Sequence, residues 1–178
     1  TRITSLTIEE KASLYMAFIM DTFNRIKNLG GVDMFSFYTP LSGRDEISKV
    51  IPYRVSLTPQ KGSDLGGRLF NVFFSLFRRG YERVAVIGSD SPSIPPEYVQ
   101  EAFSIVEGSE SLVLGPAKDG GYYLIAMDRV TFKRAGKTLF SGIPWGSSMV
   151  LKETVKRAKA NNIALKLLKQ WYDIDTKE

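Results

Sequence analysis

The side chains that could carry chemistry in this 178-residue chain are carboxylates, hydroxyls, lysines and arginines, because the sequence contains neither cysteine nor histidine. This composition excludes disulfides, thiolate nucleophiles, zinc and iron–sulfur centres and histidine-based catalysis. The remaining options are chemistry by oxygen and nitrogen groups, by backbone amides, and by hard metal ions such as Mg²⁺ or Mn²⁺, which prefer oxygen ligands.

Aspartates follow three predicted strands at the points where the strands end. Asp90 follows the first of these strands, Asp119 the second, and Asp173 and Asp175 the third. In an open α/β sheet, ligands bind outside the carboxyl ends of the strands. We therefore expect these carboxylates to share one rim and to hold a divalent metal, which would neutralise phosphate oxygens. The alternative is that Asp90 only shapes a turn and that the last two aspartates form a solvated chain end.

A polar, glycine-rich segment at 60–67 leads into a predicted helix. Its amides and the helix N-terminus could hold an anion, although the spacing matches neither the Walker A motif nor GxGxxG. Arg2 and Arg68 could bind phosphate, because a guanidinium donates to two oxygens at once; alternatively, Arg68 belongs only to the polar face of its helix. Trp145 and Trp171 lie beside Gly, Pro and Asp residues, where they either stack on a base or sugar or anchor their loops.

Alternating helical and strand patterns must position these residues. The patterns predict helices at about 7–28, 65–79, 95–106 and 148–160, and strands at 32–38, 53–57, 84–87, 111–114, 121–127 and 163–168. Thr7 and Glu10 form a capping box at the start of the first helix. The unbroken apolar run 84–87 is typical of a central parallel strand that is covered on both faces. This alternation indicates an α/β fold with a mostly parallel sheet.

Composition and charge narrow the class of protein further. The chain is 43% hydrophobic and 24% charged, as in an ordinary globular domain, and its length suits one core, so we expect a single domain over 1–178. The net charge of +5 reflects either a solvated lysine-rich face or attraction for an anionic small molecule. No apolar run could span a bilayer, and no basic run interleaved with aromatics predicts nucleic-acid binding. The lack of cysteine fits a reducing cytoplasm, where we expect the protein.

Four segments stand in the order found in one known family. They are 88–92 (Gly-Ser-Asp-Ser-Pro), 114–125 (with Asp-Gly-Gly-Tyr-Tyr), 143–148 (Ile-Pro-Trp-Gly-Ser-Ser) and 171–176 (Trp-Tyr-Asp-Ile-Asp-Thr). On these motifs nearly the whole chain resembles the glycosyltransferase-A-like family called radical-SAM/selenodomain-associated transferases. The resemblance implies the nucleotide-diphospho-sugar transferase fold, a Rossmann-like three-layer sandwich that binds a nucleotide and a divalent metal.

Carried over residue by residue, the resemblance implies roles for several side chains. Asp90 matches the metal-binding aspartate, and Asp175 matches a late aspartate that completes the metal site in nucleotidyltransferase relatives. Asp119, Gly120 and Gly121 would line the acceptor or sugar side. The residues that match the family's Gln-x-Gly-x-Asp-Leu-Gly-x-Arg segment are Gln60, Gly62, Asp64, Leu65, Gly66 and Arg68.

The chain departs from the family pattern at two places. Family members begin with a strand and a Pro-Gly-rich phosphate loop that ends in Lys-Thr-Arg-Leu, whereas residues 1–3 resemble only the tail of that motif. We therefore expect the N-terminal strand and most of the phosphate loop to be absent from this chain. The paired Asp-x-Asp of many glycosyltransferases is reduced to Asp90, so a metal would also need Asp175, water or the substrate's phosphates.

These features favour a metal-dependent transferase that passes a glycosyl group from a nucleotide-diphospho-sugar to an unidentified small-molecule acceptor. Mg²⁺ or Mn²⁺ held by Asp90 would stabilise the departing nucleoside diphosphate, and Asp119 is preferred over Asp173 as general base. One alternative is a guanylyl- or cytidylyltransferase that uses a nucleoside triphosphate and a small phosphorylated molecule. The other is a catalytically inactive nucleotide-binding protein.

Overall fold

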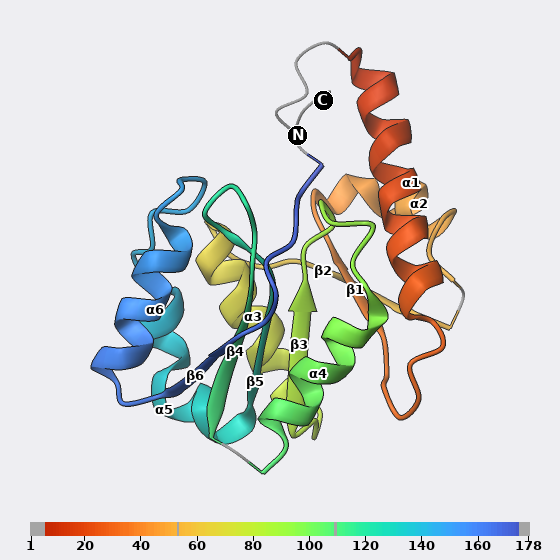
Figure 1. Ribbon diagram of the computed structural model, residues 1–178. Helices are drawn as coiled ribbons and strands as arrows, with labels where there is room; N and C mark the ends of the chain where they lie inside the picture. The colour runs from red at the N-terminus through yellow and green to blue at the C-terminus, as the bar shows by residue number, and fades with distance from the viewer. Residues whose placement is uncertain (1–5, 53, 109, 175–178) are drawn as a thin grey trace. The chain divides into compact units, whose positions relative to one another are not determined.

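The computed structural model describes residues 6–52, 54–108 and 110–174 (Figure 1). The helices are α1 (Ile8–Ile26), α2 (Arg44–Ser48), α3 (Leu65–Arg78), α4 (Pro96–Val106), α5 (Arg129–Phe140), α6 (Val150–Ala160) and the 3-10 helix η1 (Leu41–Gly43). The strands are β1 (Phe35–Tyr38), β2 (Ser56–Pro59), β3 (Arg83–Ile87), β4 (Ser111–Pro116), β5 (Tyr122–Asp128) and β6 (Ala164–Leu167). The described chain divides into two compact units: the terminal unit, from 6–60, 89–96 and 173–174, and the sheet unit, from 61–88 and 97–172.

A four-stranded sheet in the order β3-β5-β4-β6 forms the centre of the sheet unit. β5 is antiparallel to both β3 and β4, and β6 is parallel to β4. Three of the four strands thus run in one direction and β5 is reversed, so this sheet is mixed rather than the mostly parallel sheet that was predicted. The reversal follows from the short loop between β4 and β5, because two parallel strands need a connection of a dozen or more residues.

β3 was expected to be a central strand with parallel neighbours, and this prediction is wrong for the sheet that the described residues form. β3 lies at one end of the strand order, and its described strand partner is the antiparallel β5. Only Val84 of this strand is fully buried, and the residues after it are half-buried. An apolar run indicates a strand, but it does not fix the position of that strand in the sheet.

Helices cover both faces of this sheet and give the unit three layers. The Tyr123 ring centroid lies 6.4 Å from that of Tyr98 in α4, whereas the Tyr122 ring centroid lies 6.3 Å from that of Trp145, shortly before α6. Adjacent residues of a strand face opposite sides, so these two tyrosines mark the two faces. Figure 1 shows α4 on one face and α3, α5 and α6 on the other.

Aromatic side chains from α3 and α5 form much of the core on the second face. Phe73 is fully buried, and its ring centroid lies 6.1 Å from that of Phe132 and 5.6 Å from that of Phe140. The helical stripe that predicted α3 is confirmed, except that Leu65, in the first turn, is exposed. Stacked and tilted aromatic pairs of this kind stabilise a core beyond the area that they bury.

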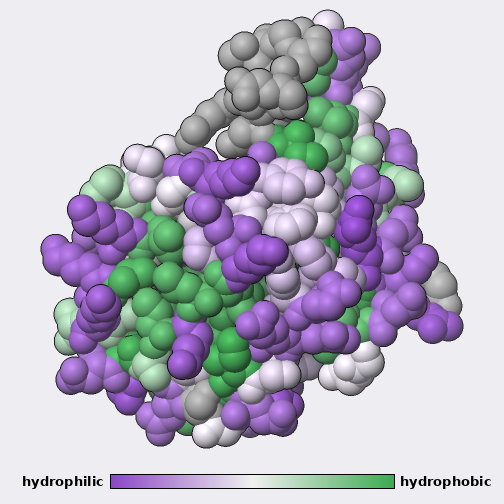
Figure 2. Space-filling view, viewed as in Figure 1, coloured by the Kyte–Doolittle hydropathy of each residue, from purple (hydrophilic) through white to green (hydrophobic). Residues whose placement is uncertain are grey.

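The edge strand β6 leaves an apolar surface open to solvent. Figure 2 shows apolar side chains gathered over this part of the sheet unit, and Leu167 of β6 is 54% exposed. The neighbouring Lys166 is also exposed, and charged residues on an edge strand oppose pairing with another chain.

The terminal unit contains α1 and the parallel pair β1–β2. The predicted capping box at Thr7 is confirmed: the Thr7 amide donates to Glu10 Oε2 at 2.8 Å, and the Glu10 amide donates to Thr7 Oγ1 at 3.2 Å. The hydrogen bond from the Thr7 amide lowers the pKa of Glu10. β2 begins later than predicted, because the Val55 amide donates to the Pro52 carbonyl and makes a turn there.

Two helical segments were not predicted. They are the segment that contains η1 and α2, and the helix α5, none of which has a counterpart among the elements predicted from the sequence. α5 begins at an N-cap, Asp128, whose side chain accepts from the Thr131 amide at 2.7 Å. No helix among the described ranges is both long enough and apolar enough to cross a membrane.

Candidate functional site

The loop after β3 and the segment after β6 meet in the terminal unit. The Ile174 amide donates to the Asp90 carbonyl oxygen at 2.9 Å, and the Ser91 hydroxyl donates to Asp173 Oδ1 at 2.5 Å. Ser91 and Asp173 are 82 residues apart in the sequence. The fold thus makes Asp173 a neighbour of the Asp90 loop.

This loop is held by bonds to its own residues. Ser91 is 1% exposed, and its carbonyl accepts from the Ile94 amide at 3.1 Å, which closes a turn around the buried Ile94. Asp90 itself is half-buried, and its Oδ1 accepts from the Ser89 hydroxyl at 3.3 Å. The Asp90 carboxylate therefore extends from a backbone that packing and hydrogen bonds restrain.

The donor atoms of this pair fit a hard divalent cation. Both side chains are carboxylates, the ligands that Mg²⁺ and Mn²⁺ prefer. In the part of the chain that the structure describes, no group of three or more acidic side chains converges. Asp90 and Asp173 would thus offer such an ion two carboxylates, and water or phosphate oxygens would complete its shell. The predicted further ligand, Asp175, lies outside the described residues, as does Arg2.

The loop that carries Asp119 lies in the sheet unit. Asp119 is exposed, and its Oδ1 accepts from the Gly121 amide at 2.8 Å. Gly120 has a φ of +90°, and a Cβ at this position would clash with the Ser148 carbonyl oxygen. The Leu151 amide also donates to the Gly120 carbonyl at 2.9 Å. The glycine is therefore required by packing against residues at the start of α6, a role that the sequence does not reveal.

The carboxyl ends of β4 and β6 meet beside this loop. Ala117 forms a parallel bridge with Trp171, and the Lys118 amide donates to the Trp171 carbonyl at 3.1 Å. The Trp171 ring packs edge-on against Tyr98 at 5.6 Å and stacks on Tyr172 at 5.1 Å. Its contacts are those of an aromatic residue that anchors a chain segment.

The predicted phosphate-binding segment closes over the first turn of α3. Asp64 is the N-cap of this helix, and its Oδ1 accepts from the Gly67 amide at 2.7 Å. Gly62 has a φ of +140°, and its Cα lies so near the helix that a Cβ would come within 2.5 Å of the Arg68 amide nitrogen. The Arg68 Nε donates back to the Gly62 carbonyl at 3.5 Å. An anion at this helix N-terminus would have to share it with the Asp64 carboxylate.

Trp145 lies against the same turn of α3. A Cβ on the buried Gly66 would come within 2.5 Å of Trp145 Nε1, and this nitrogen is itself buried without a hydrogen-bond partner. The ring meets Tyr122 nearly edge-on, at an interplanar angle of 82°. The structure thus brings Gly66 and Trp145 together, and Ser148 of the same loop contacts Gly120. Here Trp145 anchors its loop.

Gln60 lies in the terminal unit at the end of β2. Its amide donates to the Tyr38 carbonyl at 2.8 Å, and its side-chain Nε2 donates to the Phe37 carbonyl at 3.0 Å. These bonds extend the β1–β2 pair by one residue. Gln60 and Asp90 therefore belong to one unit, whereas the glycine-rich loop, Trp145 and Asp119 belong to the other.

Sequence reasoning gave no site role to Ser91 and kept Asp173 only as a second choice for the base. The signal for Ser91 was its place beside Asp90 in the Ser-Asp-Ser-Pro motif. Tyr122 and Tyr123 face opposite sides of the sheet. Tyr123 is 2% exposed, and Tyr122 is half-buried with its hydroxyl oxygen fully buried. Burial raises the pKa of each phenol; Thr154 offsets part of the shift at Tyr122, although its geometry falls short of a hydrogen bond.

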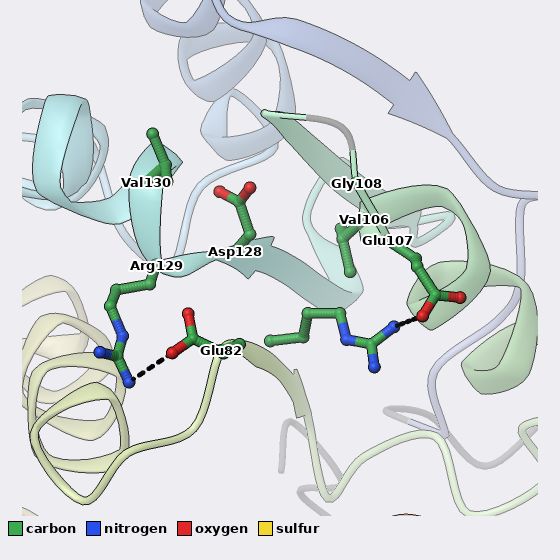
Figure 3. Close-up of a pocket in the computed structure, with 8 residues that line it drawn as sticks. Glu82, Val106, Glu107, Gly108, Asp128, Arg129 and Val130 are labelled. Carbon is green, nitrogen blue, oxygen red and sulfur yellow. Dashed lines mark ion pairs between the residues drawn. The ribbon is translucent and has the colours of Figure 1, made fainter.

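A depression of about 310 Å³ lies elsewhere, where β3 begins and β5 ends (Figure 3). Its charged side chains pair with one another: Arg129 with Glu82 at 3.0 Å, and Arg83 with Glu107 at 2.6 Å. Asp128 at its edge is occupied as the N-cap of α5. The depression contains none of the predicted site residues, and its paired charges indicate a structural role.

Comparison with known proteins identifies the family and the fold. Residues 22–147 match the family described as "uncharacterized protein conserved in bacteria (DUF2064)". The chain belongs to this family. It is also similar to the crystal structure of a proposed nucleotide-diphospho-sugar transferase from Desulfovibrio desulfuricans G20, with 31% identity and a TM-score of 0.86 over 94% of this chain and 71% of that one. No curated protein matches significantly.

More distant structures share the fold alone. One is 4-diphosphocytidyl-2C-methyl-D-erythritol synthase from Anaerococcus prevotii DSM 20548, with 11% identity and a TM-score of 0.59 over 88% of this chain and 76% of that one. Another is CMP:2-keto-3-deoxy-manno-octonic acid synthetase in complex with CTP, with 10% identity and a TM-score of 0.61 over 89% of this chain and 82% of that one. Together with the Desulfovibrio match, they confirm the nucleotide-diphospho-sugar transferase fold, a Rossmann-like α/β architecture.

Proposed function

We propose that this protein is a metal-dependent transferase that moves a glycosyl group from a nucleotide-diphospho-sugar to a small-molecule acceptor. The observation that carries the proposal is the junction of the Asp90 loop with the C-terminal segment, where the Ile174 amide donates to the Asp90 carbonyl and the Ser91 hydroxyl donates to Asp173 Oδ1. Two aspartates from distant parts of the sequence thus flank one junction. The similarity to the Desulfovibrio protein, named for this class of activity, supports the same conclusion.

Asp90 and Asp173 would hold Mg²⁺ or Mn²⁺, whose charge would offset that of the diphosphate as the nucleoside diphosphate departs. Asp175, the next acidic residue in the chain, is the further ligand that we propose. The metal site therefore needs no Asp-x-Asp pair at Asp90, because the C-terminal segment supplies the second carboxylate.

The exposed Asp119 is the proposed general base. The Gly121 amide donates to its Oδ1, which orients the carboxylate. An ionised carboxylate can accept the proton of an acceptor hydroxyl as that oxygen attacks the sugar carbon. Gly120 and Gly121 are proposed to line the acceptor, and Gly62 and Gly66 to bind the nucleotide.

Side chains proposed to bind the nucleotide come from several segments. Arg2 and Arg68 would bind phosphate oxygens, because each guanidinium donates to two oxygens at once. Gln60, Asp64 and Trp145 are also proposed to take part in nucleotide binding. Asp64 and Trp145 already make the contacts with α3 described above, so we expect them to act by holding the loop more than by touching the base.

A second candidate is nucleotidyl transfer from a nucleoside triphosphate. The observation that favours it is that the same fold occurs in a synthetase whose structure contains CTP and in a cytidylyltransferase. The two candidates differ in the product that leaves: nucleoside diphosphate in glycosyl transfer, and pyrophosphate in nucleotidyl transfer.

The test is a thermal-unfolding screen of the protein against nucleotide-sugars and nucleoside triphosphates, with and without Mn²⁺, followed by identification of the released product. A ligand that binds only the native state raises the melting temperature. We expect a shift that requires Mn²⁺ and is lost in Asp90→Asn but kept in Asp21→Asn, which changes an exposed aspartate of α1. A wild-type protein that binds no nucleotide in a metal-dependent way would overturn the proposal. A cytoplasmic location stays a prediction, which imaging of a fluorescent fusion would check.

A further inference from the structure

Ser91 is a buried polar residue beside the candidate site. Ser91 is 1% exposed, whereas Asp173, which accepts its hydrogen bond at 2.5 Å, is only half-buried. The bond therefore joins a rigid interior donor to a carboxylate that reaches solvent. Its length of 2.5 Å lies at the short end of the range for O–H···O hydrogen bonds.

This bond does more than attach the C-terminal segment. The Ile174 amide and the Asp90 carbonyl already join the two backbones at 2.9 Å. A backbone bond fixes where the Asp173 Cα lies but leaves the side-chain torsions free. The Ser91 hydroxyl fixes those torsions, because it holds one oxygen of the carboxylate in place.

We propose that Ser91 is a positioning residue of the proposed transferase: its buried hydroxyl holds the Asp173 carboxylate beside Asp90 so that both can bind the same divalent cation. This inference rests on the proposed function. Carboxylates that ligate metals are themselves oriented by hydrogen bonds from outside the ligand shell, and loss of such a bond typically weakens metal binding by about 10–100-fold.

The experiment measures Mn²⁺ binding to the intact protein by electron paramagnetic resonance, alongside thermal unfolding. In Ser91→Ala we expect Mn²⁺ affinity to fall about tenfold or more, and Ser91→Thr, which keeps the hydroxyl, to restore most of it. Asp173→Asn keeps an oxygen that accepts the Ser91 bond but removes the charge, so it should fold normally and bind Mn²⁺ at least as weakly as Ser91→Ala.

A matched control is Ser48→Ala, which removes a hydroxyl of the terminal unit that donates only to the Asp45 carbonyl, at 2.7 Å. It should leave Mn²⁺ binding unchanged. If Ser91→Ala binds Mn²⁺ as the wild type does, the positioning role is overturned while the transferase proposal stands. If the wild type binds no Mn²⁺ with or without nucleotide, both fall. If Ser91→Ala does not fold, wild-type affinity in Asp173→Asn overturns the inference.

Discussion

Replacing Gly120 by alanine is expected to destabilise the protein because two separate costs meet at this position. The φ of +90° disfavours any L side chain by about 1–2 kcal/mol. A Cβ would also press on the Ser148 carbonyl, which is backbone and cannot turn aside, and overpacking of this kind costs about 1–3 kcal/mol. Alanine recovers about 0.4–1 kcal/mol by restricting the unfolded chain. The expected net loss is about 1–4.5 kcal/mol in the free energy of unfolding.

Gly146→Ala separates the two costs. Gly146 has a φ of +80° in the neighbouring loop, but a Cβ there would meet no heavy atom within 4 Å. This variant carries the torsional cost alone, so Gly120→Ala should be less stable than Gly146→Ala by about 1–3 kcal/mol. Urea unfolding followed by circular dichroism measures both. Equal losses in the two variants would refute the claim that close packing against Ser148 requires the glycine.

Two other predictions concern groups around the same loops. Arg157 donates to Glu153 Oε1 at 3.1 Å and to three backbone carbonyls, those of Thr138, Ser141 and Gly142. Arg157→Met should therefore lower the free energy of unfolding, measured in urea, by about 1.5–3 kcal/mol. Lys156→Met removes an ion pair with Glu153 at 3.8 Å and should leave the free energy of unfolding almost unchanged. Equal losses of stability in the two variants would contradict this prediction. The raised pKa values of Tyr122 and Tyr123 mean that the unfolded chain loses these protons first, near pH 10, so stability should hold below that pH and fall above it. The stability of Tyr122→Phe should fall less steeply with pH. Phenolate absorbance that appears before unfolding would show that the phenols are not buried.

Local sequence patterns were sufficient for most of the fold. The Thr7–Glu10 capping box and the apolar stripe of α3 each predicted a helix that the structure contains. α5 was missed although its signals are local: Asp128 is an N-cap, and buried residues recur at four-residue steps through Ala135 and Leu139. Its high lysine, arginine and threonine content hid that stripe. β2 was placed too early, because Tyr53 to Val55 look like a strand, whereas Pro52 favours a turn.

The candidate site was predicted less completely, because proximity in space depends on how distant segments pair. Asp90 could be named from its place after a strand, and Asp173 from its spacing to the chain's last strand. The bond between Ser91 and Asp173 joins residues 82 positions apart, and no local pattern encodes it. Likewise, the family resemblance implied that Gly120 lines the acceptor or sugar side, and the structure shows that Ser148 lies against it.

The sequence by itself determined the type of chemistry: without cysteine or histidine, this chain has carboxylates, hydroxyls and cationic side chains to work with. It also determined the alternation of strands and helices, because the periods of apolar residues are local properties. Only the tertiary structure decided that β5 runs against its neighbours and that the Ser91 hydroxyl donates to Asp173. Those outcomes depend on strand pairing and on packing between segments far apart in the chain, which are settled when the whole core forms.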